Sequence, residues 1–225
     1  MVIRQAVRLI SDMLESVTDD AYFEARQIVS EISGGKMPFE EISDAQLAEC
    51  EDKAKRRKTG EPLQYILGEW DFMDFSLKVG PGVLCPRADS EVVCETAIEL
   101  LQGVPSPRVY DLCAGTGCLG LGIARHVPGA DVTCVEKSPD AWPYLTANTA
   151  DSGVRTMQAD VFTYYKLLSE ECANLIISNP PYLTGPEMGA LMPETAHEPA
   201  MALDGGADGL DFYRLLTTRY KAALR

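Results

Sequence analysis

The chain has 225 residues, and its 34 Asp and Glu against 20 Lys and Arg give a formal net charge of −14. A chain of this length can bury roughly 70–75% of the surface that its unfolded form exposes, enough for one large domain or for a domain with a small companion. Hydrophobic residues make up 46% of the chain, which excludes a disordered protein. No apolar run approaches the roughly 20 residues that span a bilayer. The negative charge argues against nucleic-acid binding, which relies on Lys and Arg.

Cysteine and histidine usage indicates a reducing compartment and argues against a metal centre. The seven cysteines are scattered without a C-x-x-C pair, so we expect reduced thiols that act as small buried hydrophobic groups. The two histidines are too few to complete a zinc-ligand cluster. Arg4, Arg8 and Asp12 interrupt the N-terminal segment, which therefore does not resemble a signal peptide. We expect a soluble, cytoplasmic protein that binds neither a membrane nor a metal.

The first sixty residues predict a small helical bundle. Apolar residues recur at three- and four-residue steps in residues 3–14 and again in residues 21–32, as they do on one face of a helix. A third helix is expected to begin after Ser43, which has Gln46 three residues on as its capping-box partner. Its basic residues, 53–58, are expected on an exposed helix end. This region holds no residue set suited to chemistry, so its default role is docking or a lid.

A β-hairpin linker is predicted for residues 69–87. Apolar residues alternate from Trp70 to Val79, and Met73-Asp74 is placed at the turn between two short strands. A helix follows. Its apolar positions include Val92, Val93, Ala97, Ile98 and Leu101.

From residue 108 onward, short apolar segments alternate with helical ones. The strands are expected at residues 109–113, 131–136, 154–158 and 174–178, and a last helix from Asp208 to about Leu224. Fully apolar strands separated by helices are typical of a parallel sheet covered on both faces. The sequence therefore predicts an α/β fold.

A glycine-rich turn lies where the first strand meets its helix. Gly115, Gly117 and Gly120 form the G-x-G-x-x-G pattern with which many proteins bind dinucleotides. The glycines let a ligand approach backbone N–H groups, and the helix N-terminus adds a positive field. Glu136, at the end of the next strand, can accept both hydroxyls of a ribose. A tight turn without a ligand has the same glycines, but Glu136 makes ribose binding the stronger interpretation.

Two ligands, a nicotinamide dinucleotide and S-adenosylmethionine, would suit this turn. The segment Asn179-Pro180-Pro181-Tyr182, at the end of the fourth strand, separates them. Its prolines remove N–H donors, so the Asn179 amide and the Pro180 carbonyl are left as acceptors for a planar –NH2 group, and the Tyr182 ring can pack on the face of that group. Hydride transfer has no use for such a site, whereas methylation of an amide or amino nitrogen does. A rigid proline turn is the structural alternative.

The turn, Glu136, Asp160 and the Asn179–Tyr182 segment resemble those of class I S-adenosylmethionine methyltransferases that modify –NH2 nitrogens. Residues 62–68, 84–91 and 197–210, together with the N-terminal helices, resemble peptide chain release factor N(5)-glutamine methyltransferases, and the resemblance covers essentially the whole chain. It implies a Rossmann-like methyltransferase domain, incomplete at its C-terminus, over residues 88–225 and a substrate-docking domain over residues 1–68. The chain departs from the family at Cys113-Ala114, where Gly-Thr or Gly-Ser is usual, at Glu136, where Asp is usual, and at Ala88-Asp89-Ser90.

The resemblance also implies roles. The cofactor would be S-adenosylmethionine, and the substrate would be the glutamine of the Gly-Gly-Gln motif in a release factor. The residues expected to bind the cofactor are Asp111, Cys113, Ala114, Gly115, Thr116, Gly117, Glu136, Asp160, Val161 and Asn179. The catalytic residues would be Asn179, Pro180 and Tyr182, joined by Pro181 and Arg87 in substrate binding. Asp160 also suits a helix N-cap, and Arg87 a structural ion pair.

Three other readings stay open: an amino-methylase of adenine in nucleic acid, a catalytically impaired cofactor-binding fragment, and an oxidoreductase. The family resemblance further implies strands beyond residues 174–178. Without them that strand would be a hydrophobic edge, which proteins normally cover. We therefore expect that the 225 residues are a fragment of a longer chain or that another chain covers this edge.

Overall fold

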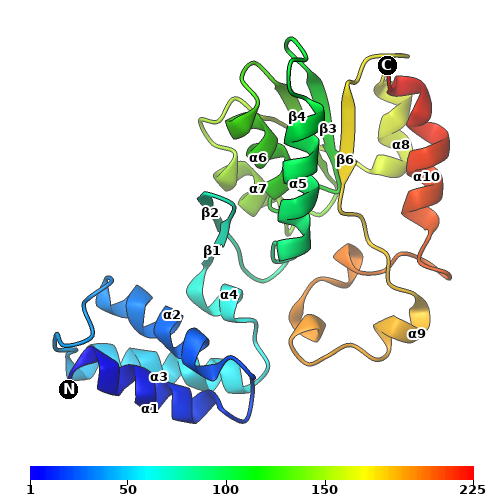
Figure 1. The fold of residues 1–225 in the computed structure, drawn as a ribbon. Coiled ribbons are helices and arrows are strands. Elements are labelled where there is room, and N and C mark those ends of the chain that lie inside the picture. The colour runs from blue at the N-terminus through cyan, green and yellow to red at the C-terminus, as the bar shows by residue number, and fades with distance from the viewer. The chain divides into compact units, whose positions relative to one another are not determined.

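The computed structural model describes residues 1–225, which fold as two compact units (Figure 1). Residues 1–68 and 193–197 form the helical unit, and residues 69–192 and 198–225 form the sheet unit. The chain thus leaves the sheet unit at residue 193 and returns to it at residue 198. Every helix is too short or too polar to cross a lipid bilayer.

The helices of the helical unit are α1 (Ile3–Leu14), α2 (Ala21–Ser33), α3 (Asp44–Lys58) and α4 (Leu63–Leu67). The predicted apolar face of α1 is confirmed, since Ile3 and Ile10 are buried within it. Helix α2 ends at Gly34, whose φ of 72° is the left-handed conformation that suits glycine. The predicted capping box is also present: Ser43 Oγ accepts the Gln46 N–H at 3.2 Å, and Gln46 Oε1 accepts the Ser43 N–H at 3.2 Å.

The basic residues at the end of α3 are not simply a solvated face, as the sequence suggested. Arg57 is only 3% exposed. Its guanidinium donates to both carboxylate oxygens of Glu24, at 2.7 and 3.0 Å, and to Glu194 Oε2 at 3.1 Å. The exposed-face expectation is wrong at Arg57 because acidic partners from α2 and from residues 193–197 surround it, which a local charge pattern does not reveal.

The strands of the sheet unit are β1 (Glu69–Phe72), β2 (Phe75–Lys78), β3 (Arg108–Leu112), β4 (Asp131–Glu136), β5 (Arg155–Gln158) and β6 (Leu175–Ser178). Its helices are α5 (Ala88–Leu100), α6 (Cys118–His126), α7 (Trp142–Asn148), α8 (Val161–Tyr164), α9 (Gly185–Met188) and α10 (Asp211–Arg219), with 3-10 turns at Tyr165–Leu167, Ala200–Ala202 and Lys221–Ala223. Another 3-10 turn, Thr195–His197, belongs to the helical unit.

The predicted parallel sheet is confirmed, with the strand order β5-β4-β3-β6. Asp111 of β3 lies opposite Cys134 of β4 and Ile177 of β6. Because all four strands run in the same direction, their carboxyl ends meet at one edge, where α/β proteins bind ligands. Strand β6 lies at the edge of the sheet. Just before it, the Ala173 N–H donates to the Ala223 carbonyl at 2.8 Å.

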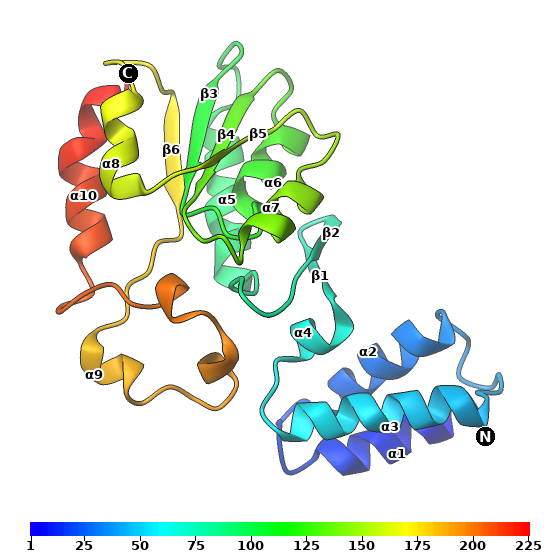
Figure 2. The same ribbon diagram turned by 180° about the vertical axis from the view of Figure 1, so that it is seen from behind.

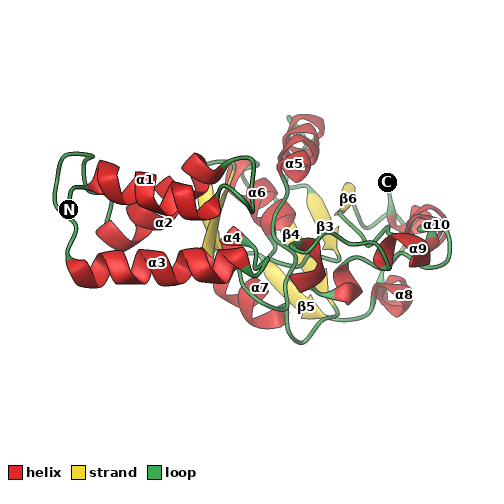
Figure 3. Ribbon diagram, turned by 90° about the horizontal axis from the view of Figure 1, so that it is seen from below, coloured by secondary structure: helices red, strands yellow, loops and turns green.

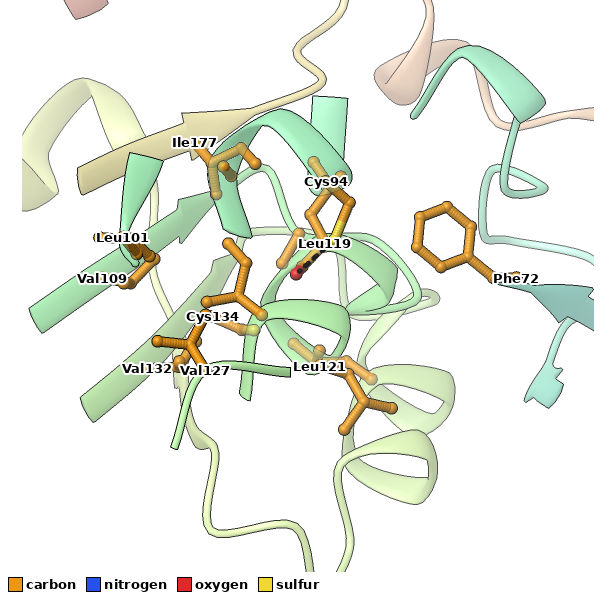
Figure 4. Close-up of a cluster of buried hydrophobic side chains, with 14 of the residues drawn as sticks. Phe72, Cys94, Leu101, Val109, Leu119, Leu121, Val127, Val132, Cys134 and Ile177 are labelled. Atoms are coloured by element: carbon orange, nitrogen blue, oxygen red, sulfur yellow. Dashed lines mark hydrogen bonds between the residues drawn. The ribbon is translucent and has the colours of Figure 1, made fainter. Parts of the chain in front are cut away.

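Helices cover both faces of this sheet (Figure 2, Figure 3). On one face, α5, α6 and α7 enclose a core in which Val109, Val132 and Ile177, from three neighbouring strands, belong to one cluster with Cys94 (Figure 4). On the other face, α8 and α10 pack on a second core that begins with Tyr110. Adjacent β3 residues therefore face opposite cores, as expected for a strand buried on both faces.

The predicted hairpin of β1 and β2 is confirmed, with Met73-Asp74 at its turn. Two of the apolar residues of α5, Val92 and Val93, are 62% and 46% exposed. Cys94 lies on the buried side instead, close enough to α6 that a Cβ on Gly122 would lie 2.6 Å from its sulfur. Because Gly122 has no side chain, α5 and α6 can pack closely together at Cys94.

Candidate active site

A cleft opens at the carboxyl ends of the strands in the sheet unit. It contains about 980 Å³ of space, counting the part that is open to solvent. The site residues singled out in the sequence that line it are Asp111, Cys113, Ala114, Gly115, Thr116, Glu136, Asp160, Val161, Asn179 and Pro181. Those that do not line it are Gly117, Pro180, Tyr182 and Arg87. One cavity thus brings together residues from the ends of four different strands.

The glycines of the turn between β3 and α6 have different structural roles. Gly115 has a φ of 55°, and a Cβ there would meet nothing nearer than Val83 Cγ2 at 3.8 Å, so its backbone is open to the cleft. A Cβ on Gly117 would lie 2.7 Å from Leu145 Cδ1 of α7. A Cβ on Gly120 would lie 2.3 Å from the Cys134 sulfur. Gly115 therefore keeps the turn accessible to a ligand, while the other two let α6 pack closely.

The Asp111 carboxyl is fully buried at the base of this turn. Oδ2 accepts the Gly120 N–H at 2.9 Å, whereas Oδ1 has no hydrogen-bond partner. Burial raises the pKa of Asp111 to about 7, because a low-dielectric environment disfavours its charged form.

Glu136, at the end of β4, is held by two backbone amides. Its Oε2 accepts the Gly115 N–H at 2.8 Å, and its Oε1 accepts the Ser138 N–H at 2.7 Å. The carboxylate is thereby locked in orientation, and each oxygen keeps a lone pair for a further donor. This geometry suits a pair of neighbouring hydroxyl groups.

Asp160 caps α8, as the sequence allowed, because its Oδ1 accepts the Phe162 N–H at 2.9 Å. Its Oδ2 pairs with Lys137 Nζ at 2.9 Å. Partial burial alone would raise the pKa of Asp160, but these hydrogen bonds outweigh it and lower the pKa. Beyond the cap, Phe162 meets Phe212 of α10 edge to face, with ring centroids 5.1 Å apart. Both rings line the cleft beside Val161 and give this end an apolar wall.

Asn179 follows β6 and contacts α5. Its Nδ2 donates to Ser90 Oγ at 3.3 Å, so Oδ1 is the end of the amide left for a ligand. Pro180 is buried and Tyr182 is 55% exposed. Tyr182 does not line the cleft, and the next residue, Leu183, donates its N–H to the Leu203 carbonyl at 2.8 Å.

Arg87 forms an ion pair with Glu198, whose side chain is 2% exposed. The other oxygen of Glu198 accepts the Cys85 N–H at 3.1 Å. Burial raises the pKa of Glu198, and Arg87 and these hydrogen bonds oppose that shift. Arg87 thus has a structural partner, which ties the segment before α5 to the segment before the Ala200–Ala202 turn.

Several residues that line the cleft were not singled out as site residues: Val83, Ser90, Lys137, Pro199, Met201 and Phe212. Ser90 lies in one of the segments that carried the family resemblance, so a signal was present there. No sequence signal pointed to Phe212, because an aromatic residue in the first turn of a helix is more often part of a hydrophobic core than of a binding site.

Comparisons with known proteins agree with this fold. Residues 81–204 match the Methyltransferase small domain family, and residues 5–68 match the PrmC N-terminal domain family. A release factor glutamine methyltransferase of Geobacter sulfurreducens is 39% identical over 176 residues, covering 78% of this chain and 61% of that protein. One from Mycolicibacterium smegmatis is 41% identical, covering 81% and 65%.

The chain thus spans about three fifths of the length of some curated relatives that it matches. A release factor glutamine methyltransferase of Clostridium acetobutylicum aligns with all of this chain over 83% of its own length, at 32% identity. A match of this extent, together with the matches to the two domain families, is sufficient to assign the chain to a protein family. The chain belongs to the release factor glutamine methyltransferase family.

Proposed function

We propose that this protein transfers a methyl group from S-adenosylmethionine to the side-chain amide nitrogen of the glutamine in the Gly-Gly-Gln motif of peptide chain release factors. The observation that carries the proposal is that one cleft is lined by the open turn at Gly115, by Glu136 and by Asn179. A site for a ribose-bearing cofactor therefore adjoins an amide acceptor suited to an –NH2 group.

The residues present suit this cofactor. Asp111 Oδ1, buried and without a partner, suits the cationic methionine end, and the fixed carboxylate of Glu136 suits the ribose hydroxyls. The apolar wall of Val161 and Phe162 suits a planar base. When bound, S-adenosylmethionine would supply a methyl group made electrophilic by the adjacent cationic sulfur. Breaking of that carbon–sulfur bond would leave the neutral thioether S-adenosylhomocysteine, and the methylated nitrogen would release one proton to solvent.

The chain's own residues would then orient the substrate. An amide nitrogen is a poor nucleophile because its lone pair is delocalised into the carbonyl. Asn179 Oδ1 and the Pro180 carbonyl, which is bonded to the lining residue Pro181, would accept its two N–H bonds and favour a more pyramidal nitrogen. The ring of Tyr182 would cover the face of the amide. Positioning and electrostatics of this kind supply most of the acceleration in such transfers.

We infer that residues 1–68 bind the release factor away from the reacting glutamine. The helical unit holds exposed aromatic residues, such as Tyr22 and Phe23 at the start of α2, which are 63% and 49% exposed. Its sequence matches the N-terminal domain of the same family. Arg87, held by Glu198, would contribute to substrate binding only through the part of its side chain that is exposed.

Incubation of the protein with tritiated S-adenosylmethionine and either a release factor or duplex DNA tests the proposal. We expect label on the release factor alone, and mass spectrometry should find one methyl group on its Gly-Gly-Gln glutamine. Label on DNA and not on the release factor would instead identify an adenine methylase.

A further inference from the structure

Asn179 depends on a side chain from another element to present its acceptor end. A primary amide has two ends of opposite character, because Oδ1 accepts hydrogen bonds and Nδ2 donates them. An –NH2 group of the substrate can be held only by Oδ1. If the amide turned by 180°, two donors would face each other across the cleft. Whatever fixes the rotation of this amide therefore decides whether the site works.

Ser90 is the residue that contacts the donor end of this amide. The Asn179 Nδ2 donates to Ser90 Oγ at 3.3 Å, across 89 positions of sequence. Ser90 is 5% exposed and lines the cleft. It lies in the first turn of α5, where its N–H donates to the Arg87 carbonyl at 2.9 Å. The hydroxyl is thus attached to a helix start and is not free to follow Asn179 if the amide moves.

The segment that carries Ser90 is itself anchored. Glu198 accepts the Cys85 N–H and pairs with Arg87, three residues before Ser90. A buried carboxylate therefore sets where α5 begins and, through it, where the Ser90 hydroxyl lies.

We propose that Ser90 is a positioning residue for the methyl transfer: its hydroxyl accepts from Asn179 Nδ2 and thereby aims Asn179 Oδ1 at the substrate amide. The inference rests on the proposed function for its consequence in catalysis. Its structural content, the orientation of the Asn179 amide, can be tested without any substrate.

Three substitutions separate the hydroxyl from the space it fills. Ser90→Ala removes the acceptor, Ser90→Cys keeps a similar volume with a weak acceptor, and Ser90→Thr keeps the hydroxyl. Thr96→Ala is the matched control, because it removes a hydroxyl from the exposed side of the same helix, where Thr96 Oγ1 bonds only the Val92 carbonyl at 2.8 Å.

In the methyl-transfer assay, we expect Ser90→Ala and Ser90→Cys to lower kcat by about ten- to a hundredfold, as misplacement of a reacting group does. The affinity for S-adenosylmethionine, measured by calorimetry, should stay within about twofold, since none of the changes removes a proposed cofactor contact. Ser90→Thr should recover most of kcat, and Thr96→Ala should match the wild type. Equal losses of kcat and of cofactor affinity would overturn the proposal, because they would indicate general damage to the cleft.

The amide orientation is read by NMR on protein labelled with 15N at asparagine. The chain has three asparagines, so the side-chain signals of Asn148 and Asn174, which have other hydrogen-bond partners, serve as internal controls. The signal of Asn179 is assigned with Asn179→Ala. In Ser90→Ala, the Asn179 –NH2 protons should exchange with water faster and shift, while the other two pairs do not change.

Unchanged Asn179 signals in Ser90→Ala overturn the proposal, as would fast exchange of the Asn179 –NH2 protons already in the wild type, which would mean that the donor end faces the cleft. A wild type that methylates no release factor would refute the proposed function instead. In that case the NMR result still decides whether Ser90 orients Asn179.

Discussion

At the scale of single residues, the acceptor of Asn179 is the group on which methyl transfer should depend most. Asn179→Ala removes the amide that would hold the substrate –NH2 group but leaves the turn at Gly115 and the carboxylate of Glu136 in place. We expect kcat to fall by at least about a hundredfold, while S-adenosylmethionine binding, measured by calorimetry, largely persists. Comparable turnover by this variant and the wild type would show that Asn179 is not the catalytic acceptor.

Asp111 should make the stability of the fold depend on pH. Its carboxyl has a pKa raised by burial from 3.8 to about 7. Between these values the folded chain holds a proton that the unfolded chain has released, so the free energy of unfolding falls as the pH rises from about 4 to about 7. Below this window both states are protonated, and above it both are ionised.

The variant Asp111→Asn keeps the shape of the side chain but cannot titrate. Relative to this variant, the wild type should lose about 1.4 kcal/mol of unfolding free energy per pH unit in the middle of the window. Urea unfolding followed by circular dichroism at several pH values between about 5 and 7 measures the difference. All other titrating groups are common to both proteins and cancel. A difference that does not vary with pH would contradict the raised pKa.

At the scale of structural elements, the segment after Asn179 is held by glycines further along the chain. The Gly205 N–H donates to the Leu183 carbonyl at 2.8 Å. A Cβ on Gly205 would lie 2.6 Å from Tyr182 Cα, and one on Gly209 would lie 2.3 Å from the Tyr182 carbonyl oxygen. These contacts are with backbone, which has no flexible end to move aside. The loop can therefore follow its path only if positions 205 and 209 lack side chains.

Gly205→Ala should consequently destabilise the sheet unit by about 1–3 kcal/mol, the usual cost of overpacking, and also lower kcat. Gly185→Ala is the matched control, since a Cβ there meets no atom within 4 Å and its φ is not positive. We expect that control to change stability by less than about 1 kcal/mol. Urea unfolding and the methyl-transfer assay together measure both effects. Equal stability of the two variants would mean that the loop yields easily.

At the scale of the whole molecule, the division into two units predicts that damage to one can leave the other intact. Arg57→Ala would leave the carboxylates of Glu24 and Glu194 without their buried partner, which typically costs about 3–5 kcal/mol. Lys55→Ala is the control, because its ion pair with Asp52 is exposed on both sides and such pairs contribute at most about 1 kcal/mol.

We expect Arg57→Ala to melt the helical unit at lower urea concentration and to raise KM for the release factor. Its S-adenosylmethionine affinity should match that of the wild type, because every proposed cofactor contact lies in the sheet unit. Loss of cofactor binding with retained release factor binding would reverse the roles assigned to the two units.

Much of the sheet unit is predictable from the sequence because its signals are local. Apolar runs such as 174–178 mark strands buried on both faces, and the spacing of Gly115 and Gly117 marks a turn that only glycine tolerates. The capping box of Ser43 is likewise contained within four residues. Patterns of this kind depend on residues that are close in sequence, so they predict local structure without knowledge of the rest of the fold.

Contacts between residues distant in sequence were decided by the tertiary structure alone. The sequence placed Arg57 at a solvated helix end, and this expectation failed because its acidic partners, Glu24 and Glu194, come from other elements. The bond from Asn179 to Ser90 spans 89 positions, and the close fit of Gly205 against Tyr182 also joins residues that are not neighbours in sequence. Periodicity reports only which face of an element is apolar. Which polar groups meet across a cleft depends on how helices and strands pack, and that is settled by close packing and by the need to pair buried polar atoms.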